Sequence, residues 1–288
     1  MDQSPPDPTF DVQDFVRRVL AEDLGSGGDV TGRSTIPADA RFAAVMASRE
    51  RITVAGLDVA SAFFRALDRE VRIERPVADG QSVEAGKVLM RLEGNARALL
   101  AAERSALNTL QHLSGIATLT RRYADAIEGT GATLLDTRKT LPGLRLLDKY
   151  AARMGGAENH RMRLDDGVLI KDNHVAVCGS VEQAVLAAKA AETGLQVQVE
   201  VDRIDQIELA LAAGADRLLL DNMDVATLRQ AVALVAGRVP LEASGGVHLD
   251  TIRGIAETGV DYVSVGRITQ SAPAVDIGLD YELQPLQI

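Results

Sequence analysis

The sequence predicts an α/β protein in two parts: an N-terminal α+β sandwich domain followed by an α/β barrel. The first observation behind this prediction is a unit, a short apolar run followed by a helical pattern, that repeats through the second half of the chain. The second is the composition, because 46% hydrophobic residues with only 3% aromatic ones suit helices packed on parallel strands better than stacked antiparallel sheets.

The first part of the chain mixes helical and strand-like patterns. Residues 11–24 carry apolar side chains at helical spacing and predict an amphipathic helix. Residues 41–92 form short strand-like runs, interrupted by a helical pattern at 59–67 and by turns at Asp79-Gly80 and Ala85-Gly86. Together these patterns predict a small α+β sandwich.

The Ala- and Leu-rich segment 96–129 has helical periodicity throughout. We expect two helices there, split near Ser114-Gly115, and we place the junction between the domains at this pair. The predicted segments are therefore 1–113 for the sandwich domain, 114–273 for the barrel domain, and 274–288 for a C-terminal tail that returns to the N-terminal domain.

The second half of the chain contains six short apolar runs that end in polar residues or glycines, with helical patterns between them. Alternating strands and helices of this length force parallel strands with right-handed crossovers, which leaves a doubly wound sheet or a barrel. The regular repetition favours the barrel, in which all strand carboxyl ends meet at one rim. The runs lie at residues 133–139, 168–173, 197–202, 217–222, 240–246 and 261–267.

Many residues at the ends of these runs are cationic, and the barrel should bring them together. A single Arg at a strand end is usually a solvated or ion-paired surface residue. Several like charges in one concave site repel each other and lose hydration, so they favour an anionic ligand such as a carboxylate or a phosphate. The cations are Arg138, Lys139, Lys171 and Arg267, with His160 and Arg161 in a loop that can fold over the same opening.

The last two runs end in glycines, which let backbone N–H groups approach a phosphate closely. Barrels of this kind commonly bind phosphate in the loops after their final two strands. We therefore predict a phosphate site formed by Ser244, Gly245, Gly246, Gly266 and Arg267.

Glu200 and Asp221 end adjacent runs and can hold Mg²⁺ through carboxylate oxygens and water. Salt bridges from these carboxylates to Lys171 or Lys139 are an equally good interpretation. The histidines do not have a recognisable zinc spacing, and His112, on an Ala- and Leu-rich helix, is interpreted as a packed or partnered core residue.

Charge and cysteine content exclude several classes of protein. The net charge of -10 argues against nucleic-acid binding. The single cysteine, Cys178, allows neither a disulfide framework nor a cysteine-based metal site within one chain. Since no targeting segment or membrane-spanning run is evident, we expect a cytoplasmic protein without membrane association.

Several longer segments follow one another in a characteristic order: ERSALNTLQHLSGIAT, LLDTRKTLPGLR, KYAARMGGAENHRM, VLIKDNH, VEVD, LLLDN, EASGG and GVDYVSVGRITQSAP. In these segments the chain resembles the quinolinate phosphoribosyltransferase family, also called carboxylating nicotinate-nucleotide pyrophosphorylase. The resemblance extends from AEDLGSGGDVTG near residue 21 to DIGLDY near residue 281.

The resemblance implies a partly open α/β barrel of six or seven parallel strands with an N-terminal open sandwich. It further implies a homodimer in which one subunit's N-terminal domain caps the other's barrel, so that active sites are shared; assembly beyond the dimer stays open. The substrates would be quinolinate and phosphoribosyl pyrophosphate, the latter with Mg²⁺, and no organic cofactor is expected. The products would be nicotinate mononucleotide, pyrophosphate and CO₂, as in NAD biosynthesis.

The resemblance also assigns roles to individual residues. Lys139, Lys171, Glu200 and Asp221 would be catalytic, with Glu200 and Asp221 also serving phosphoribosyl pyrophosphate and its Mg²⁺. The quinolinate pocket would contain Arg104 from the neighbouring subunit together with Thr137, Arg138, Lys139, His160, Arg161 and Lys171. The 5′-phosphate would bind Ser244, Gly245, Gly246, Val265, Gly266 and Arg267.

Two positions depart from the family's pattern. Gln270 stands where family members often have His, and Gln cannot carry charge. Arg267 stands where a small residue is expected and can supply the missing positive charge. The segment RMRLDDGV, which enters Lys171, also differs from the usual apolar and small pattern.

Three alternatives stay open at this point. A related transferase would use nicotinate or another ring acid instead of quinolinate. A Schiff-base aldolase would use Lys171 as its nucleophile, since a lysine at the end of a barrel strand suits that role. A non-catalytic protein would bind a phosphorylated ligand without turning it over.

Overall fold

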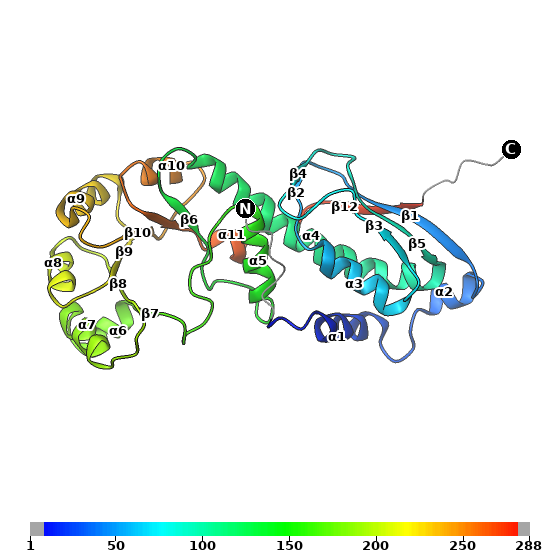
Figure 1. Ribbon diagram of the computed structural model, residues 1–288, viewed down its shortest axis with the longest axis horizontal. Helices are drawn as coiled ribbons and strands as arrows, with labels where there is room; N and C mark the ends of the chain where they lie inside the picture. Colours follow the sequence, from blue (N-terminus) through cyan, green and yellow to red (C-terminus); the bar gives the residue numbers. More distant parts are fainter. Residues whose placement is uncertain (1–8, 282–288) are drawn as a thin grey trace. The chain divides into compact units, whose positions relative to one another are not determined.

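The computed structural model describes residues 9–281, so that 1–8 and 282–288, within the predicted N-terminal domain and C-terminal tail, lie outside the described residues (Figure 1). The chain divides into two compact units. The first contains the chain up to Leu119, Leu146–Gly156 and the chain from Ser271 onward, within the described residues; the second contains Thr120–Arg145 and Ala157–Gln270.

The first unit is built on a four-stranded antiparallel sheet in the order β12-β1-β5-β3, accompanied by a small β2-β4 pair. Helices α3 and α4 lie along one face of the larger sheet (Figure 1), which makes this unit the open sandwich that was predicted. Its elements are α1 (Val12–Leu24), α2 (Val30–Thr35), β1 (Arg41–Ser48), β2 (Ile52–Thr53), α3 (Leu57–Leu67), β3 (Arg72–Glu74), β4 (Ser82–Val83), β5 (Val88–Asn95), α5 (Arg145–Gly155), β12 (Ile277–Tyr281) and the part of α4 (Ala96–Ala126) up to Leu119; the last turns of α4 belong to the second unit.

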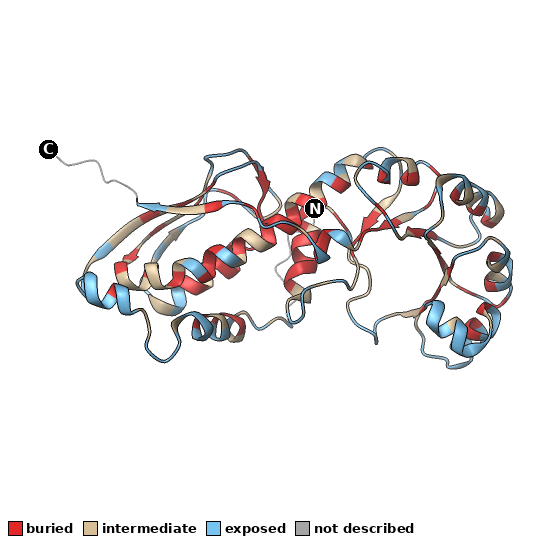
Figure 2. Ribbon diagram, turned by 180° about the vertical axis from the view of Figure 1, so that it is seen from behind, coloured by how far each residue is buried: buried red, intermediate tan, exposed pale blue. Residues whose placement is uncertain are grey.

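Apolar residues with helical or strand spacing form the core of this unit. Phe63 and Phe64 on α3, with Met46 on β1 and Met90 on β5, are completely buried, and Figure 2 shows the buried residues concentrated on the facing sides of strands and helices. Phe15 on α1 packs edge-on against Phe63 with ring centroids 6.0 Å apart, so α1 covers α3.

The predicted break near Ser114-Gly115 is wrong, because α4 continues through both residues. Gly115 lacks a side chain for a reason of packing: a Cβ there would lie 2.2 Å from the carbonyl oxygen of Pro273. The Ser114 hydroxyl receives a hydrogen bond from the Ala55 N–H (3.1 Å). Both residues, which resemble a helix stop in the sequence, are therefore contact residues within a continuous helix.

Two segments group with the first unit although they are distant in sequence. Residues 146–156, which the sequence assigns to the barrel domain, belong here because Tyr150 donates a hydrogen bond to Asp79 (2.6 Å) and Asp148 pairs with His112 (2.8 Å). This contact makes His112 a partnered residue, as predicted. Residues 277–281 of the C-terminal segment form β12, which pairs with β1.

The second unit is a six-stranded parallel sheet in the order β6-β11-β10-β9-β8-β7, and helices follow the strands along the outside of its curve (Figure 1). All six predicted strand runs are confirmed, as is the α/β fold class. The elements are β6 (Thr133–Leu135), β7 (Val168–Ile170), α6 (Asp172–Cys178), α7 (Val181–Ala190), β8 (Val197–Val201), α8 (Asp205–Ala212), β9 (Arg217–Asp221), α9 (Val225–Val235), β10 (Leu241–Ser244), α10 (Ile252–Ala256), β11 (Tyr262–Ser264) and α11 (Arg267–Gln270).

The barrel is open between its edge strands, β6 and β7, which are not neighbours in the described sheet. A single parallel bridge between Leu135 and Glu158 extends the β6 edge. The described sheet therefore has six strands, within the predicted range of six or seven.

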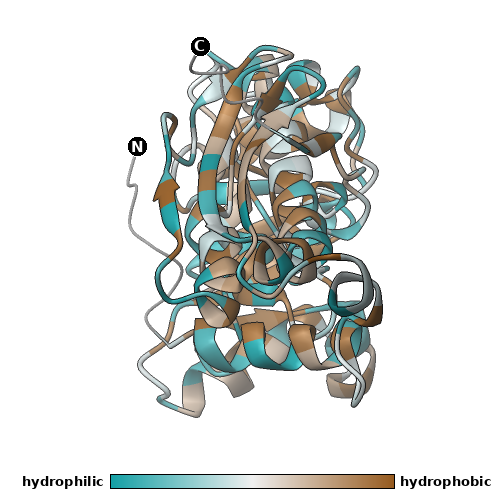
Figure 3. Cartoon of the chain, turned by 90° about the vertical axis from the view of Figure 1, so that its right-hand side faces the viewer, coloured by the Kyte–Doolittle hydropathy of each residue, from teal (hydrophilic) through white to brown (hydrophobic). Residues whose placement is uncertain are grey.

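Helices α7 and α9 of this unit begin at side-chain caps and bury one face. Ser180 accepts a hydrogen bond from the Gln183 N–H (3.1 Å) at the start of α7, and Asp224 accepts one from the Thr227 N–H (2.8 Å) at the start of α9. The helices carry both hydrophobic and hydrophilic residues (Figure 3). No helix among residues 9–281 combines the length and the apolar character needed to cross a bilayer.

Candidate active site

A cavity of about 710 Å³ opens at the carboxyl ends of the six parallel strands. This is the position at which barrel enzymes carry their active sites. The predicted binding residues of the second unit all line it, namely Thr137, Arg138, Lys139, His160, Arg161, Lys171, Glu200, Asp221, Ser244, Gly245, Gly246, Val265, Gly266 and Arg267.

The alternation of side chains along each strand explains why these residues converge. Glu200 lies near the end of β8, Asp221 ends β9 and Ser244 ends β10, and the strands are in parallel register, with Asp221 paired to Ser244. Since every second residue of a strand points to the same face, the inward-facing set continues down the barrel to Glu242, which also lines the cavity.

One wall of the cavity is cationic. Arg161 is held by a hydrogen bond from its guanidinium to the Gly167 carbonyl (2.9 Å), and burial together with the neighbouring charge of Arg138 lowers the pKa of Arg161. The Nε atom of Arg138 is buried and, among the described residues, has no hydrogen-bond partner. Two guanidinium groups that repel each other and keep an unused donor are suited to an anionic ligand with several oxygens.

Two carboxylates lie on the opposite part of the rim. Burial raises the pKa of Glu200, and the charge of Asp221 raises it further, while Lys171, 3.7 Å away, opposes the shift. Burial also raises the pKa of Asp221, against a hydrogen bond that it accepts from the Asn222 amide (2.6 Å). The Lys171 ion pair is one of the two arrangements that the sequence left open.

The two carboxylates fit a magnesium ion that shares its coordination with a substrate. No group of three or more His, Cys, Asp or Glu side chains suited to a metal occurs in residues 9–281, so a site made only of protein ligands is not present there. Mg²⁺ commonly uses one or two carboxylates together with waters and phosphate oxygens. Glu200 and Asp221 offer this donor set, and a bound cation would favour their charged forms, which burial disfavours.

The third part of the rim consists of glycine-containing turns, in which the backbone lies close to neighbouring side chains. Gly245 has φ +87°, and a Cβ there would lie 2.2 Å from the Asn222 Oδ1. A Cβ on Gly266 would lie 2.8 Å from the Lys139 Cδ. No larger residue fits either position without movement, so these turns are built for close approach, as a phosphate site requires.

The sequence reasoning missed several residues of the cavity. Glu242 and His248 line it, and Glu242 could have been found, because it lies two residues before Ser244 in a strand. Asp136 was also missed: it is fully buried and accepts hydrogen bonds from the His160 N–H (2.8 Å) and the Asn159 amide (2.5 Å). Asp136 thereby fixes the loop that carries His160 and Arg161.

Arg104 is the one predicted binding residue outside the second unit. It is exposed on α4, in the first unit, and is not among the residues that line the cavity. Gln270, noted for its departure from the family's pattern, does line the cavity together with Arg267.

The fold and the cavity define a class of protein: a barrel-like α/β enzyme scaffold that binds anionic small molecules at the carboxyl ends of its strands. Comparison with known families makes the assignment more specific. Residues 29–114 match the profile of the quinolinate phosphoribosyl transferase N-terminal domain, and residues 116–280 match that of the C-terminal domain. The chain belongs to the quinolinate phosphoribosyltransferase family, which confirms the resemblance seen in the sequence.

Individual relatives agree with this assignment. The chain is 45% identical to the carboxylating nicotinate-nucleotide pyrophosphorylase of Mycobacterium leprae over 276 residues, covering 93% of this chain and 96% of the relative. It is 40% identical to the decarboxylating quinolinate phosphoribosyltransferase 2 of Nicotiana glauca, covering 97% of this chain and 85% of the relative.

Solved structures show the same similarity in three dimensions. The nicotinate-nucleotide pyrophosphorylase of Francisella tularensis superposes with a TM-score of 0.90 at 40% identity, over 94% of this chain and 96% of that one. The corresponding protein of Ehrlichia chaffeensis gives a TM-score of 0.91 at 40% identity, over 95% of this chain and 100% of that one.

Proposed function

We propose that this chain transfers the phosphoribosyl group of phosphoribosyl pyrophosphate to quinolinate and decarboxylates the product, which yields nicotinate mononucleotide, pyrophosphate and CO₂ and serves NAD biosynthesis. The observation that carries the proposal is the division of one cavity into a cationic wall, a carboxylate pair and a glycine-lined turn. These three parts match a dicarboxylate, a positively charged transition state and a sugar phosphate.

The cationic wall accounts for the acidic ring. Arg138 and Arg161 present planar groups that can bind a carboxylate through two hydrogen bonds, and Lys139 and Lys171 add two point charges. A ring with two carboxylates compensates more of this charge than a ring with one, which favours quinolinate over nicotinate.

The carboxylate pair accounts for the chemistry at the sugar. The ring nitrogen attacks C1 of the ribose while the bond from C1 to the pyrophosphate oxygen breaks, and positive charge develops on C1 and the ring oxygen of the ribose. Glu200 and Asp221 stabilise that charge electrostatically. Binding both reactants in one cavity supplies a further part of the rate, since positioning can contribute roughly 7–11 kcal/mol in favourable cases.

Decarboxylation follows from the charge on the alkylated ring. Once the nitrogen is quaternary, the bond from C2 to its carboxylate can break, CO₂ leaves, and the electron pair that stays on C2 takes up a proton. The residues of the cationic wall hold the remaining carboxylate during this step. A bound Mg²⁺, held by Glu200 and Asp221, would neutralise charge on the pyrophosphate.

Arg104 requires a second subunit to take part in this site. We infer a homodimer in which Arg104 of one protomer supplements the cationic wall of the other. Its exposure on α4 leaves it accessible for that contact. Cross-linking or sedimentation would establish the oligomeric state, and mixing an Arg104→Ala variant with a Lys171→Ala variant should restore part of the activity if sites are shared.

A Schiff-base role for Lys171 receives less support. An amine nucleophile requires a desolvated or otherwise activated position, whereas the Lys171 side chain is 50% exposed and faces Glu200. This arrangement suits an electrostatic role toward an anion.

The test is a reaction with quinolinate, phosphoribosyl pyrophosphate and Mg²⁺, analysed for all three products. Formation of nicotinate mononucleotide with stoichiometric pyrophosphate and CO₂ supports the proposal. A product from nicotinate at equal efficiency would assign the chain to the related transferases, and trapping of a carbonyl substrate by borohydride would assign it to the aldolases. Ligand binding with no product would leave a binding protein.

A further inference from the structure

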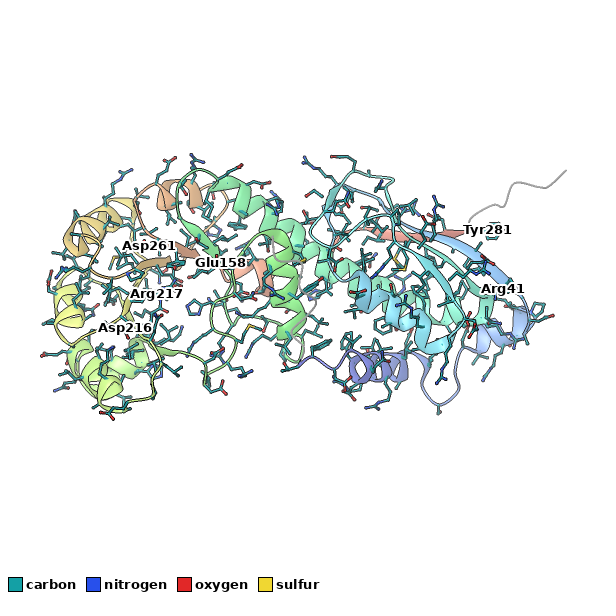
Figure 4. The ribbon with its side chains drawn as sticks, in the orientation of Figure 1. Arg41, Glu158, Asp216, Arg217, Asp261 and Tyr281 are labelled. Atoms are coloured by element: carbon teal, nitrogen blue, oxygen red, sulfur yellow. The ribbon has the colours of Figure 1, made fainter. Side chains whose placement is uncertain are left out.

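The interior of the barrel directly below the rim is polar. Gln198 lies two residues before Glu200 on β8, and Glu242 lies two residues before Ser244 on β10, so both face inward. Arg217 begins β9 on the same face as Asp221, and Figure 4 shows it on the inner side of the curved sheet. Barrel layers are usually filled by Val, Ile and Leu, and a polar layer costs stability unless its groups have partners.

Glu242 is at the centre of this layer. It is fully buried, and three nitrogens lie near the same carboxylate oxygen, Oε2. The Gln198 amide donates a hydrogen bond to it at 2.8 Å, whereas the Arg217 guanidinium at 2.8 Å and the His160 Nε2 at 3.4 Å lie at ion-pair distance without hydrogen-bond geometry. The other oxygen, Oε1, is buried without a hydrogen-bond partner among the described residues. Burial opposes ionisation, but His160, Arg217 and Gln198 outweigh it and lower the pKa of Glu242.

Arg217 already balances the charge of Glu242. Its guanidinium carbon lies 3.8 Å from the centre of the Tyr262 ring, and 19% of its side chain is exposed. The ion pair and the stacked ring compensate the charge of Arg217, although its Nε and one terminal nitrogen are buried without a hydrogen-bond partner among the described residues. The negative charge of Glu242 is therefore compensated without His160. The contact between the two residues matters for the position of the His160 ring.

His160 connects this layer to the cationic wall. Its Nδ1 accepts a hydrogen bond from the Arg161 N–H (2.8 Å), so in the neutral ring the hydrogen is on Nε2, which faces Glu242. The His160 N–H is held by Asp136. The ring therefore lies between the two groups: one nitrogen faces Glu242 at ion-pair distance, and the other accepts the N–H of the residue whose side chain extends into the cavity, Arg161.

We propose that Glu242 is a positioning residue for quinolinate: its Oε2 holds the His160 ring and thereby sets the position of Arg161 against Arg138. This inference rests on the proposed function. Glu242 does not itself bind a substrate carboxylate. Its effect should be on quinolinate binding and not on phosphate binding.

The test compares two double variants that differ in one group. Glu242→Met/Arg217→Met removes the ion pair and the acceptor facing His160, whereas Glu242→Gln/Arg217→Met removes the same two charges but keeps an amide oxygen that can take the place of Oε2. Both keep the buried volume close to that of the native pair. Arg217→Met alone and Gln198→Met, which loses a different donor to Oε2, are the controls.

We expect the Met/Met variant to raise the KM for quinolinate at least about tenfold, since small displacements of a positioning group have large effects. The KM for phosphoribosyl pyrophosphate should change less than about twofold, and the Gln/Met variant should return the quinolinate KM to the value of Arg217→Met. A general distortion of β10 would act on Ser244 and raise both KM values. Such a joint rise, or equal quinolinate KM values in the two double variants, would overturn the proposal.

A measurement on the unmodified protein keeps the inference testable if the variants do not fold. Long-range ¹H–¹⁵N spectra at alkaline pH report the tautomer of each of the four histidines, and His160 should carry its hydrogen on Nε2. The Nδ1–H tautomer would refute the inference. If wild-type protein forms no product from quinolinate, the proposed function fails, and the tautomer still reports on the Glu242 contact separately.

Discussion

Glu200 and Asp221 are two partly buried carboxylates near the ends of neighbouring strands. Burial raises the pKa of both, and the negative charge of Asp221 raises the pKa of Glu200 further. A carboxyl group whose pKa is higher in the folded state than in the unfolded state destabilises the folded state once it ionises. The pair is therefore an unfavourable feature of the free protein that becomes useful when a cation or a positively charged transition state is present.

We predict that Glu200→Gln will stabilise the free protein and impair catalysis. At neutral pH the melting temperature should rise by about 2–4 °C, the shift expected for roughly 1 kcal/mol after allowance for solvent screening. The gain should disappear as the pH falls below about 4.5, where the carboxyl group is protonated in both states. The rate should fall by about 100-fold or more. Thermal melts across pH provide the check, and a gain that persists at low pH would contradict this explanation.

Arg138→Met should weaken quinolinate binding without destabilising the free protein. The variant loses charge-assisted hydrogen bonds to quinolinate, each of which contributes roughly 1.5–3 kcal/mol, so the quinolinate KM should rise by about 10-fold to 100-fold. The melting temperature should stay equal or increase at low salt, because repulsion of Arg161 is relieved. Steady-state kinetics and melts at two salt concentrations measure both effects. A loss of folding would instead assign Arg138 a structural role.

Gly245→Ala should disrupt the phosphate end of the cavity. The new Cβ would meet Asn222 at 2.2 Å in addition to the strain of φ +87°, and together these should cost about 2–4 kcal/mol of unfolding free energy. Gly237→Ala is the matched control, because its φ is +75° and nothing lies within 4 Å; it should cost about 1–2 kcal/mol. The KM for phosphoribosyl pyrophosphate should rise only in the Gly245 variant. Equal effects of the two substitutions would argue against a close-packed turn.

Gly115→Ala tests the close approach of Pro273 to α4. Alanine has the higher helix propensity, yet its Cβ would lie 2.2 Å from the Pro273 oxygen, so we expect a loss of about 1–3 kcal/mol. Gly254→Ala in α10, where the nearest atom is a Val225 methyl at 3.8 Å, should gain about 0.5–1 kcal/mol. Denaturant titrations of both variants measure the difference, and a stabilised Gly115 variant would show that the approach to Pro273 is not required.

At the phosphate site, Arg267 should provide the positive charge that Gln270 lacks. Arg267→Ala should raise the KM for phosphoribosyl pyrophosphate by about tenfold, as expected for one charge-assisted contact, with little change for quinolinate. Adding Gln270→His should restore part of that loss below neutral pH, where the imidazole is charged. A phosphoribosyl pyrophosphate KM that does not respond to Arg267→Ala would place this side chain outside the phosphate site.

The sequence predicted the strands and rim of the second unit well because each strand is a short apolar run with a polar end. The residues Glu200, Asp221 and Ser244 lie at such ends, and parallel register brings strand ends together without further information. The role of individual residues came from the family resemblance, since a lysine or a glycine at a strand end has many uses.

What could not be predicted depends on contacts between distant segments. Gly115 resembles a helix break until Pro273 is seen against it. The inward direction of Glu242 follows from its place in the strand, but its partners Gln198, Arg217 and His160 come from distant segments and are seen only in the structure. Residues 146–156 follow a barrel strand in sequence but group with the other unit through partners such as Asp79.

Strand β12 has a consequence for the synthesis of the chain. Its residues 277–281 complete the sheet edge next to β1, although β1 leaves the ribosome more than two hundred residues earlier. The first unit therefore waits, with one row of backbone groups on β1 unpaired, until the whole barrel has been translated. An exposed strand edge of this kind invites pairing with other chains, so nascent or truncated forms lacking residues 277–281 should be more prone to aggregate than the full chain.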